Sequence, residues 1–144
     1  MVKNDFFEMP VPPGWDFEVN EDQWVAMVHP DEEGILEIVP NPVDGEDPDG
    51  TYLSTVVESV LRQMDRIARD PQLKPPTKVV QRTFKVGMGY ELRSESKDEE
   101  SFLCQYCVVG PTVALYVQYQ GPIAERRNVP SLEACLDEIR WIGR

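Results

Sequence analysis

The chain has 144 residues, of which 41% are hydrophobic and 28% are charged, and its formal net charge is −12. A single domain of this length, residues 1–144, buries roughly 68–70% of the surface that its unfolded chain exposes, so its core needs no disulfides. The negative charge repels phosphate backbones and anionic headgroups, which argues against nucleic acid and membrane surfaces as partners. The sequence shows neither a secretory signal nor an apolar run of about 20 residues, and a cytoplasmic protein is therefore expected.

The first third of the chain reads as four short strands followed by a helix. Polar or proline-containing turns separate the expected strands, which are residues 6–9, 15–19, 24–29 and 34–39. An acidic loop over residues 41–50 leads into the helix, with Asp49 or Thr51 as its candidate cap. The helix is expected to end near Arg69, because Asp70-Pro71 cannot continue it. Its apolar stripe consists of Leu53, Val56, Val57, Val60, Leu61, Met64, Ile67 and Ala68.

The next block predicts a meander of four antiparallel strands. Gly110-Pro111 is expected to be a two-residue connection, which pairs Val109 with Thr112 and fixes the register of that hairpin. Gly87-Met88-Gly89 suits a three-residue turn that places Lys85 opposite Glu91. Continuing this register brings Leu92 beside Tyr106, so that one face of the meander is apolar and the other is mixed. The apolar face is expected to carry Phe84, Phe102, Cys104, Tyr106, Val108, Val113, Leu115, Val117 and Tyr119.

A second helix is expected from about Pro130 to Ile142, with Leu132, Leu136, Ile139 and Ile142 on one stripe. The predicted fold class is therefore α+β: a curved antiparallel β-sheet with a four-strand meander, covered on one face by two helices.

The sequence offers little chemistry for catalysis or metal binding, so no enzyme, cofactor or metal is predicted. Cys104 and Cys107 form a C-x-x-C motif, but in a strand this spacing places the two thiols on opposite faces. His29 is the only histidine, and it precedes Pro30 in a turn sequence. The acidic loop has the wrong spacing for an EF-hand, since its twelfth position counted from Asp44 is Thr55.

One feature of the meander suggests binding. An uncharged apolar strip with flanking glutamines is expected on the mixed face, as either a lightly covered surface or a protein-binding face. The strip consists of Leu103, Cys107, Val109, Ala114 and Tyr116, beside Gln105, Gln118 and Gln120.

The order of elements resembles the PsbP-like superfamily. The resemblance comes from Pro12-Pro13-Gly14-Trp15 before the short strands, Tyr52-Leu53 at the helix start, Gly87-Met88-Gly89-Tyr90 in the meander and the closing helix at residues 132–142. The resemblance implies a PsbP-like α/β sandwich. The superfamily includes the DcrB-type small bacterial proteins. Members without a signal peptide include cytosolic chaperones of type VI secretion effectors, which dimerise and hold apolar helices on an uncovered sheet face.

The resemblance and the strip lead to two hypotheses. The first is a non-enzymatic adaptor or chaperone, possibly a homodimer, that binds an apolar helical segment of a secreted effector. Its partner-binding residues would be Leu103, Gln105, Cys107, Ala114, Tyr116 and Gln118. The second is an acidic immunity-type inhibitor that binds a basic toxin through Asp44, Glu46, Asp47 and Asp49.

Overall fold

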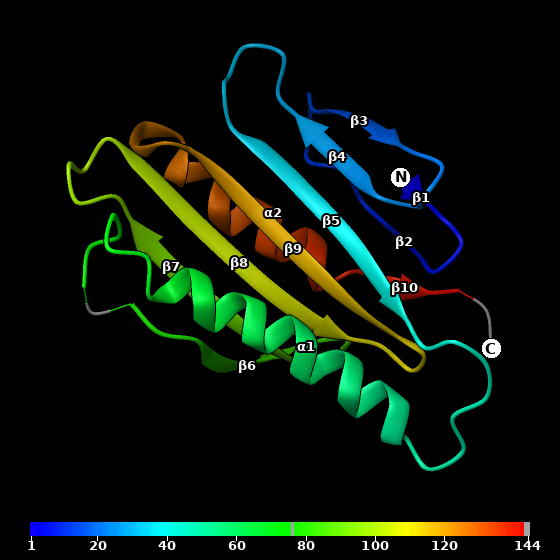
Figure 1. Cartoon of the computed structure of the whole chain (residues 1–144). Helices are drawn as coiled ribbons and strands as arrows, with labels where there is room; N and C mark the ends of the chain where they lie inside the picture. The colour runs from blue at the N-terminus through cyan, green and yellow to red at the C-terminus, as the bar shows by residue number, and fades with distance from the viewer. Residues whose placement is uncertain (76, 143–144) are drawn as a thin grey trace.

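The centre of the molecule is an antiparallel sheet of seven strands in the order β3-β4-β5-β9-β8-β7-β6. A computed structural model describes residues 1–75 and 77–142, and Figure 1 shows the sheet running diagonally through it. The strands are β3 (Asp16–Val19), β4 (Val25–Val28), β5 (Ile35–Pro42), β6 (Val80–Phe84), β7 (Gly87–Glu95), β8 (Ser101–Val109) and β9 (Val113–Pro122). The predicted α+β class, the antiparallel meander and the short strands before it are confirmed.

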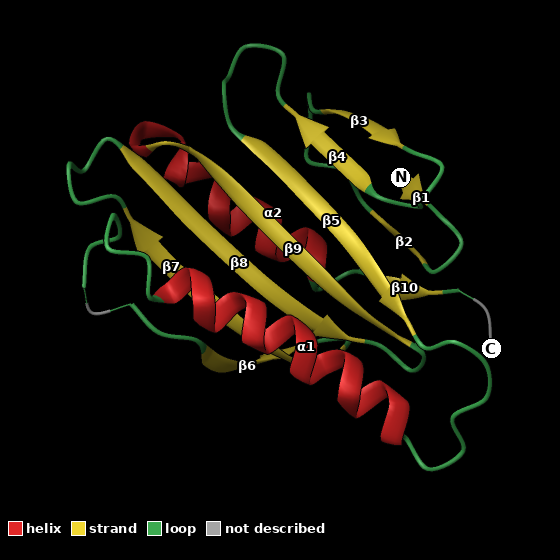
Figure 2. Cartoon of the chain, viewed as in Figure 1, coloured by secondary structure: helices red, strands yellow, loops and turns green. Residues whose placement is uncertain are grey.

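The remaining elements lie on the two faces of this sheet. The 18-residue helix α1 (Thr51–Ala68) lies on one face, and the other face is covered by α2 (Val129–Leu136) and a small second sheet (Figure 2). This small sheet has the order β1-β2-β10 and consists of β1 (Val2–Lys3), β2 (Phe7–Met9) and β10 (Arg140–Trp141). A 3-10 helix, η1 (Ile123–Asn128), leads from β9 into α2. We refer to the two faces of the large sheet as the α1 side and the α2 side.

The α2 side contains the main core. The alternating residues of β8 and β9 that the sequence assigned to the apolar face are buried there. They pack against Phe7 and Met9 of the small sheet and against Leu132 and Leu136 of α2. Burial of such apolar side chains supplies the dominant favourable free energy of folding.

The prediction that both helices cover the same face is wrong. The reason is a one-residue difference in the β7–β8 register: Leu92 pairs with Gln105 instead of Tyr106. Because side chains alternate between faces, this shift moves Tyr90 and Leu92 to the α1 side. There Leu92 packs with Met64 of α1, so α1 covers a face of its own.

The same shift places charged residues of β7 on the α2 side, where they form ion pairs. The carboxylate of Glu91 accepts hydrogen bonds from Arg82 (3.2 Å) and Arg93 (3.0 Å). Glu133 of α2 accepts hydrogen bonds from the Tyr106 hydroxyl (2.7 Å), Arg82 and Arg93. Pairing explains how these charges fit at the margin of a core.

Two turns also differ from the prediction. The β6–β7 hairpin turns at Lys85-Val86, so Phe84 pairs with Gly87 and the expected Lys85–Glu91 pair does not form. In the β8–β9 hairpin the two-residue turn is Pro111-Thr112, closed by a hydrogen bond from the Gly110 amide to the Val113 carbonyl (2.8 Å). Proline fits the first central position of such a turn, because its ring fixes φ.

The C-terminal helix is shorter than predicted. It ends at Leu136, and the chain then turns so that Trp141 of β10 pairs with Phe7. The Trp141 ring lies against Gly110, where a Cβ atom would be only 2.7 Å from its Cζ3 atom. The predicted core residues Leu132, Leu136 and Ile139 are nevertheless buried.

Candidate protein-binding surface

The α1 side of the sheet is organised in rows of side chains that cross the strands. Each row follows from the strand register, and neighbouring rows lie two residues apart along each strand. From β3 towards β7, the first row reads Asp16, Val28, Ile35, Gln120, Leu103 and Ser94. The second reads Glu18, Ala26, Glu37, Gln118, Gln105 and Leu92, and the third, from β5, reads Val39, Tyr116, Cys107 and Tyr90.

Helix α1 covers only part of these rows. Its buried residues Val60 and Met64 pack on Leu92, Cys107 and Ala114, which belong to β7, β8 and β9. In Figure 1 the helix lies towards the β7–β8 side of the sheet, and no helix lies in front of β4. Helix α1 also approaches β9 closely and comes near β5. One half of the α1 side is therefore covered and the other half is open.

The predicted strip is divided by this helix. Gln105, Cys107 and Ala114 are fully buried, so the prediction that they contact a partner is wrong. Leu103, Tyr116 and Gln118 are half-buried at the margin of α1. The strip was assigned to the correct side of β8 and β9, but α1 packs on the residues at its centre.

A hydrogen-bond network joins the covered and open halves. The Gln105 amide donates to the Tyr116 hydroxyl and to Gln118 Oε1 (2.8 Å), and the Tyr116 hydroxyl also donates to Gln118 (3.1 Å). Burial raises the pKa of Tyr116 to about 12, so its hydroxyl keeps its proton at neutral pH. The Gln105 Oε1 atom is buried without a hydrogen-bond partner. The other polar atoms of the network pair with one another and hold Tyr116 in place beside α1.

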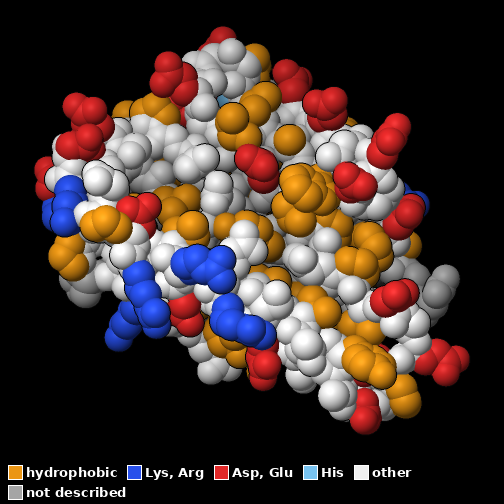
Figure 3. Space-filling model, in the orientation of Figure 1, with side chains coloured by type: hydrophobic (Ala, Val, Ile, Leu, Met, Phe, Trp, Pro, Cys, Tyr) orange, Lys and Arg blue, Asp and Glu red, His pale blue; other side chains and the backbone are white. Residues whose placement is uncertain are grey.

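The open half carries exposed apolar side chains that the sequence reading missed. Val28 and Ile35 are 37% and 42% exposed. Trp24, which precedes β4, is 45% exposed, and because its neighbour Val25 is buried in the core of the α2 side, Trp24 is assigned to the α1 side. The half-buried Ala26 lies between Trp24 and Val28, and the half-buried Val39 lies on β5 on the far side of Glu37 from Ile35. Figure 3 shows hydrophobic side chains across this face of the molecule. The apolar residues at alternate positions 24, 26 and 28 were the sequence signal for this exposed surface. We call this surface, formed by Trp24, Ala26, Val28, Ile35, Glu37, Val39, Tyr116 and Gln118, the open half-face.

A hollow adjoins one end of the open half-face. It has a volume of about 440 Å³ and is lined by Ile35, Leu103 and Gln120 of the sheet. Asp70 and Leu73, which follow α1, form its other wall. The surface beside the helix is thus concave at this end, as expected of a docking site.

The acidic loop supports α1. Both carboxylate oxygens of Asp47 accept hydrogen bonds from the first helical turn, from the amides of Tyr52 (3.0 Å) and Leu53 (2.9 Å). The Asp49 carboxylate accepts one from the Thr51 amide (3.1 Å). Acceptors at a helix start satisfy otherwise unpaired amides and interact favourably with the helix dipole. Asp44 and Glu46 are exposed, so only part of the predicted acidic site is free for a partner.

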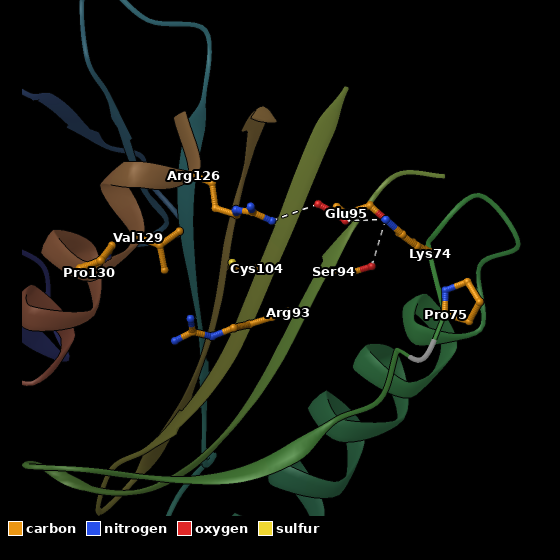
Figure 4. A pocket seen from close by; sticks show the side chains of 9 residues that line it. All are labelled: Lys74, Pro75, Arg93, Ser94, Glu95, Cys104, Arg126, Val129 and Pro130. Atoms are coloured by element: carbon orange, nitrogen blue, oxygen red, sulfur yellow. Dashed lines mark hydrogen bonds and ion pairs between the residues drawn. The ribbon is translucent and has the colours of Figure 1, made fainter. Parts of the chain in front are cut away.

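A cavity on the α2 side contains charged groups that pair with one another. Its volume is about 550 Å³, and Figure 4 shows its lining from β7, β8, the start of α2 and the loop after α1. Within it, Glu95 accepts from Arg126 (3.0 Å) and Lys74 (3.2 Å). Because its cations already have acidic partners, the cavity does not present a free charge to a ligand.

The cysteines lie as the strand spacing predicted. Cys104 packs in the core on the α2 side, and Cys107 packs under α1 on the opposite side. Burial raises the pKa of Cys104 to about 11 and that of Cys107 to about 12, so both thiols are neutral at pH 7. Among the described residues, no group of three or more His, Cys, Asp or Glu side chains is placed to hold a metal ion. In the same part of the chain, no helix has both the length and the apolar character that crossing a membrane requires.

Comparison with solved structures shows what this fold resembles. LpqN of Mycobacterium tuberculosis, described as involved in cell envelope biogenesis, matches with a TM-score of 0.68 at 12% identity, over 95% of this chain and 83% of LpqN. The cyanobacterial PsbP (CyanoP) of Synechocystis matches with a TM-score of 0.56 at 10% identity, over 97% of this chain and 95% of CyanoP. The chain has a PsbP-like fold.

A protein from Bacteroides thetaiotaomicron also matches, with a TM-score of 0.55 at 12% identity. That match covers 96% of this chain but only 46% of the Bacteroides protein. No protein-family model matches the chain, and no curated protein does. At these identities the comparisons establish the fold alone.

Proposed function

We propose that this protein is a non-enzymatic adaptor or chaperone that binds an apolar segment of another protein on its open half-face. The observation that carries the proposal is the exposure of Trp24, Val28 and Ile35 beside a helix that leaves this half of the sheet open. Exposed apolar side chains gathered on one face of a sheet are typical of an interaction site. The PsbP-like fold is compatible with a binding role.

The resemblance to type VI secretion effector chaperones suggests the source of the segment. A secreted bacterial effector with an apolar helix, bound in the cytoplasm, would match both the resemblance and the open half-face. A helix on this surface would lie on the same side of the sheet as α1 and would exclude water from Ile35 and Tyr116.

Site-specific photocrosslinking in cells tests this proposal. A photoreactive amino acid at Ile35 is expected to trap the partner, whereas the same group at the exposed Glu138, after α2 on the other side of the sheet, is not. Mass spectrometry of the adduct identifies the partner. Equal yields at both positions, or no adduct at Ile35 in cells that contain the partner, would contradict the proposal.

A second candidate function is inhibition of a basic toxin through the acidic loop. The exposed Asp44 and Glu46 favour it, together with the charge of −12. Crosslinking from position 46 but not from position 35, lost at high salt, would support the inhibitor instead.

A further inference from the structure

Charge is distributed unevenly along the chain, and the open half-face lies in its most acidic part. The sequence contains no Lys or Arg between Lys3 and Arg62, although more than half of all Asp and Glu residues lie in that segment. Strands β3, β4 and β5 all belong to it. Figure 3 shows acidic side chains along the upper and right margins of this face, and basic side chains at its lower left.

A carboxylate lies at the centre of the open half-face. Glu37 is half-buried on β5, between Ala26 of β4 and Gln118 of β9. Within the described residues, the ion pairs do not include Glu37 or its row neighbour Glu18. A partly buried carboxylate without a cationic partner is unfavourable, and docking an apolar surface over it increases that cost unless the partner supplies a cation.

The position of Glu37 defines a pattern that a partner has to match. Its row separates two apolar rows, one with Val28 and Ile35 and the other with Val39 and Tyr116. Since neighbouring rows are about 7 Å apart, a long Lys or Arg side chain can reach Glu37 while apolar groups rest on the rows beside it.

The width of the open half-face suits a single helix. Strands in a sheet lie about 4.8 Å apart, so β4, β5 and the part of β9 beyond Ala114 span roughly the 10 Å diameter of a helix. Helix α1 already covers the adjoining half, where it buries Val60 and Met64 on β7, β8 and β9. A second helix beside α1 would complete the layer on this side.

We infer that the segment bound on the open half-face is a cationic amphipathic helix, whose apolar stripe covers Val28, Ile35 and Tyr116 and whose Lys or Arg side chains pair with Glu37 and the acidic margin of β3. This inference rests on the proposed function and adds the charge of the partner to it. Opposite charges at the rim steer association, and a pair at the centre favours a cationic partner over an anionic one.

Two synthetic helical peptides with the same leucine stripe test the inference, one with lysine flanks and the other with glutamate flanks. By isothermal titration calorimetry with the whole protein, the lysine peptide is expected to bind about tenfold tighter than the glutamate peptide at low salt. Glu37→Gln should reduce this preference severalfold. Glu138→Gln makes the same charge change at an exposed position after α2 and should leave the preference unchanged.

A third variant separates docking from general attraction to an acidic protein. Ile35→Asp makes the protein more negative but removes an apolar contact, so it should weaken the lysine peptide. Stronger binding to this variant would place the peptide elsewhere and overturn the inference. Val28→Asp gives the same test if circular dichroism shows that Ile35→Asp does not fold.

The remaining outcomes distinguish the inference from the proposed function. Equal binding of the two peptides, weakened by Ile35→Asp, would overturn the charge inference and leave the apolar docking surface intact. Failure of both peptides to bind would count against both.

Discussion

The two faces of the large sheet differ in how completely they are covered. On the α2 side, the small sheet and α2 close a continuous core in which Tyr106, Leu115 and Tyr119 are almost completely buried. On the α1 side, a single helix with only two buried residues of its own, Val60 and Met64, packs on Leu92, Cys107 and Ala114, and half of the sheet remains open. The difference separates stability from binding: the closed side supplies most of the core, and the open side supplies a surface for a partner.

The largest effect is expected from a cavity on the closed side. Leu115→Ala removes a fully buried side chain from the main core and should lower the free energy of unfolding by roughly 2–5 kcal/mol. Urea unfolding measures the loss. A change below that of an exposed-site variant such as Thr83→Ala would show that the α2 side is not the main core.

A smaller loss is expected under α1. Met64→Ala should cost about 2 kcal/mol, at the low end for a buried methionine, because its neighbours on α1 are half-exposed and the helix can settle onto the sheet. The same urea experiment allows a direct comparison. If Met64→Ala lowers the free energy of unfolding more than Leu115→Ala does, the α1 side is packed at least as firmly as the α2 side, and the two faces do not differ as described.

Only some carboxylates of the acidic loop are expected to contribute to the stability of the fold. Asp47→Ala removes two hydrogen bonds to the first turn of α1 and should destabilise the protein by about 1 kcal/mol. Asp44→Ala, at an exposed position in the same loop, is the matched control and should have little effect on the urea midpoint. Equal effects would mean that the hydrogen bonds of Asp47 to α1 do not stabilise the helix.

The smallest effect is expected on the open half-face. Ile35→Ser should change the free energy of unfolding by no more than about 0.5 kcal/mol, because Ile35 is 42% exposed and belongs to neither core cluster. The same variant should weaken capture of the partner. A large loss of stability would show that Ile35 is covered in solution and is unavailable for binding.

The sequence predicted the correct side of the sheet for strand residues where the predicted register differs from the observed one by an even number of residues. It predicted the wrong side where the difference is an odd number. The β8–β9 register differs from the prediction by two residues, which leaves Cys104 and Leu115 on the predicted side. The β7–β8 register differs by one residue, which moves Leu92 and Arg93 to the opposite sides. In the loop before β8, Glu99 adopts a left-handed φ of 62°, which is uncommon for a residue other than glycine and which the sequence does not indicate.

The candidate site was predicted only in part for the same reason. The sequence assigned Leu103, Tyr116 and Gln118 to the mixed face of the meander, taken as the uncovered one. In the structure Tyr116 and Gln118 belong to the open half-face, and Leu103 lies next to it. Where α1 packs depends on Leu92 and Tyr90, which the odd shift brings to that side. A pattern confined to β8 and β9 could not show that Cys107 and Ala114 lie beneath the helix while Val28 and Ile35 remain exposed.

Hydroxyl-radical footprinting of Trp24 tests the central claim most directly. In the free protein, Trp24 should be oxidised readily, because it is 45% exposed, while Met64 should be protected beneath α1. When the partner segment identified by photocrosslinking is added, oxidation of Trp24 should fall. Oxidation of Met88, which is 52% exposed and lies in β7 near the β6–β7 turn, should be unaffected. Unchanged oxidation of Trp24 in the complex, or a Trp24 that is already protected in the free protein, would contradict the account.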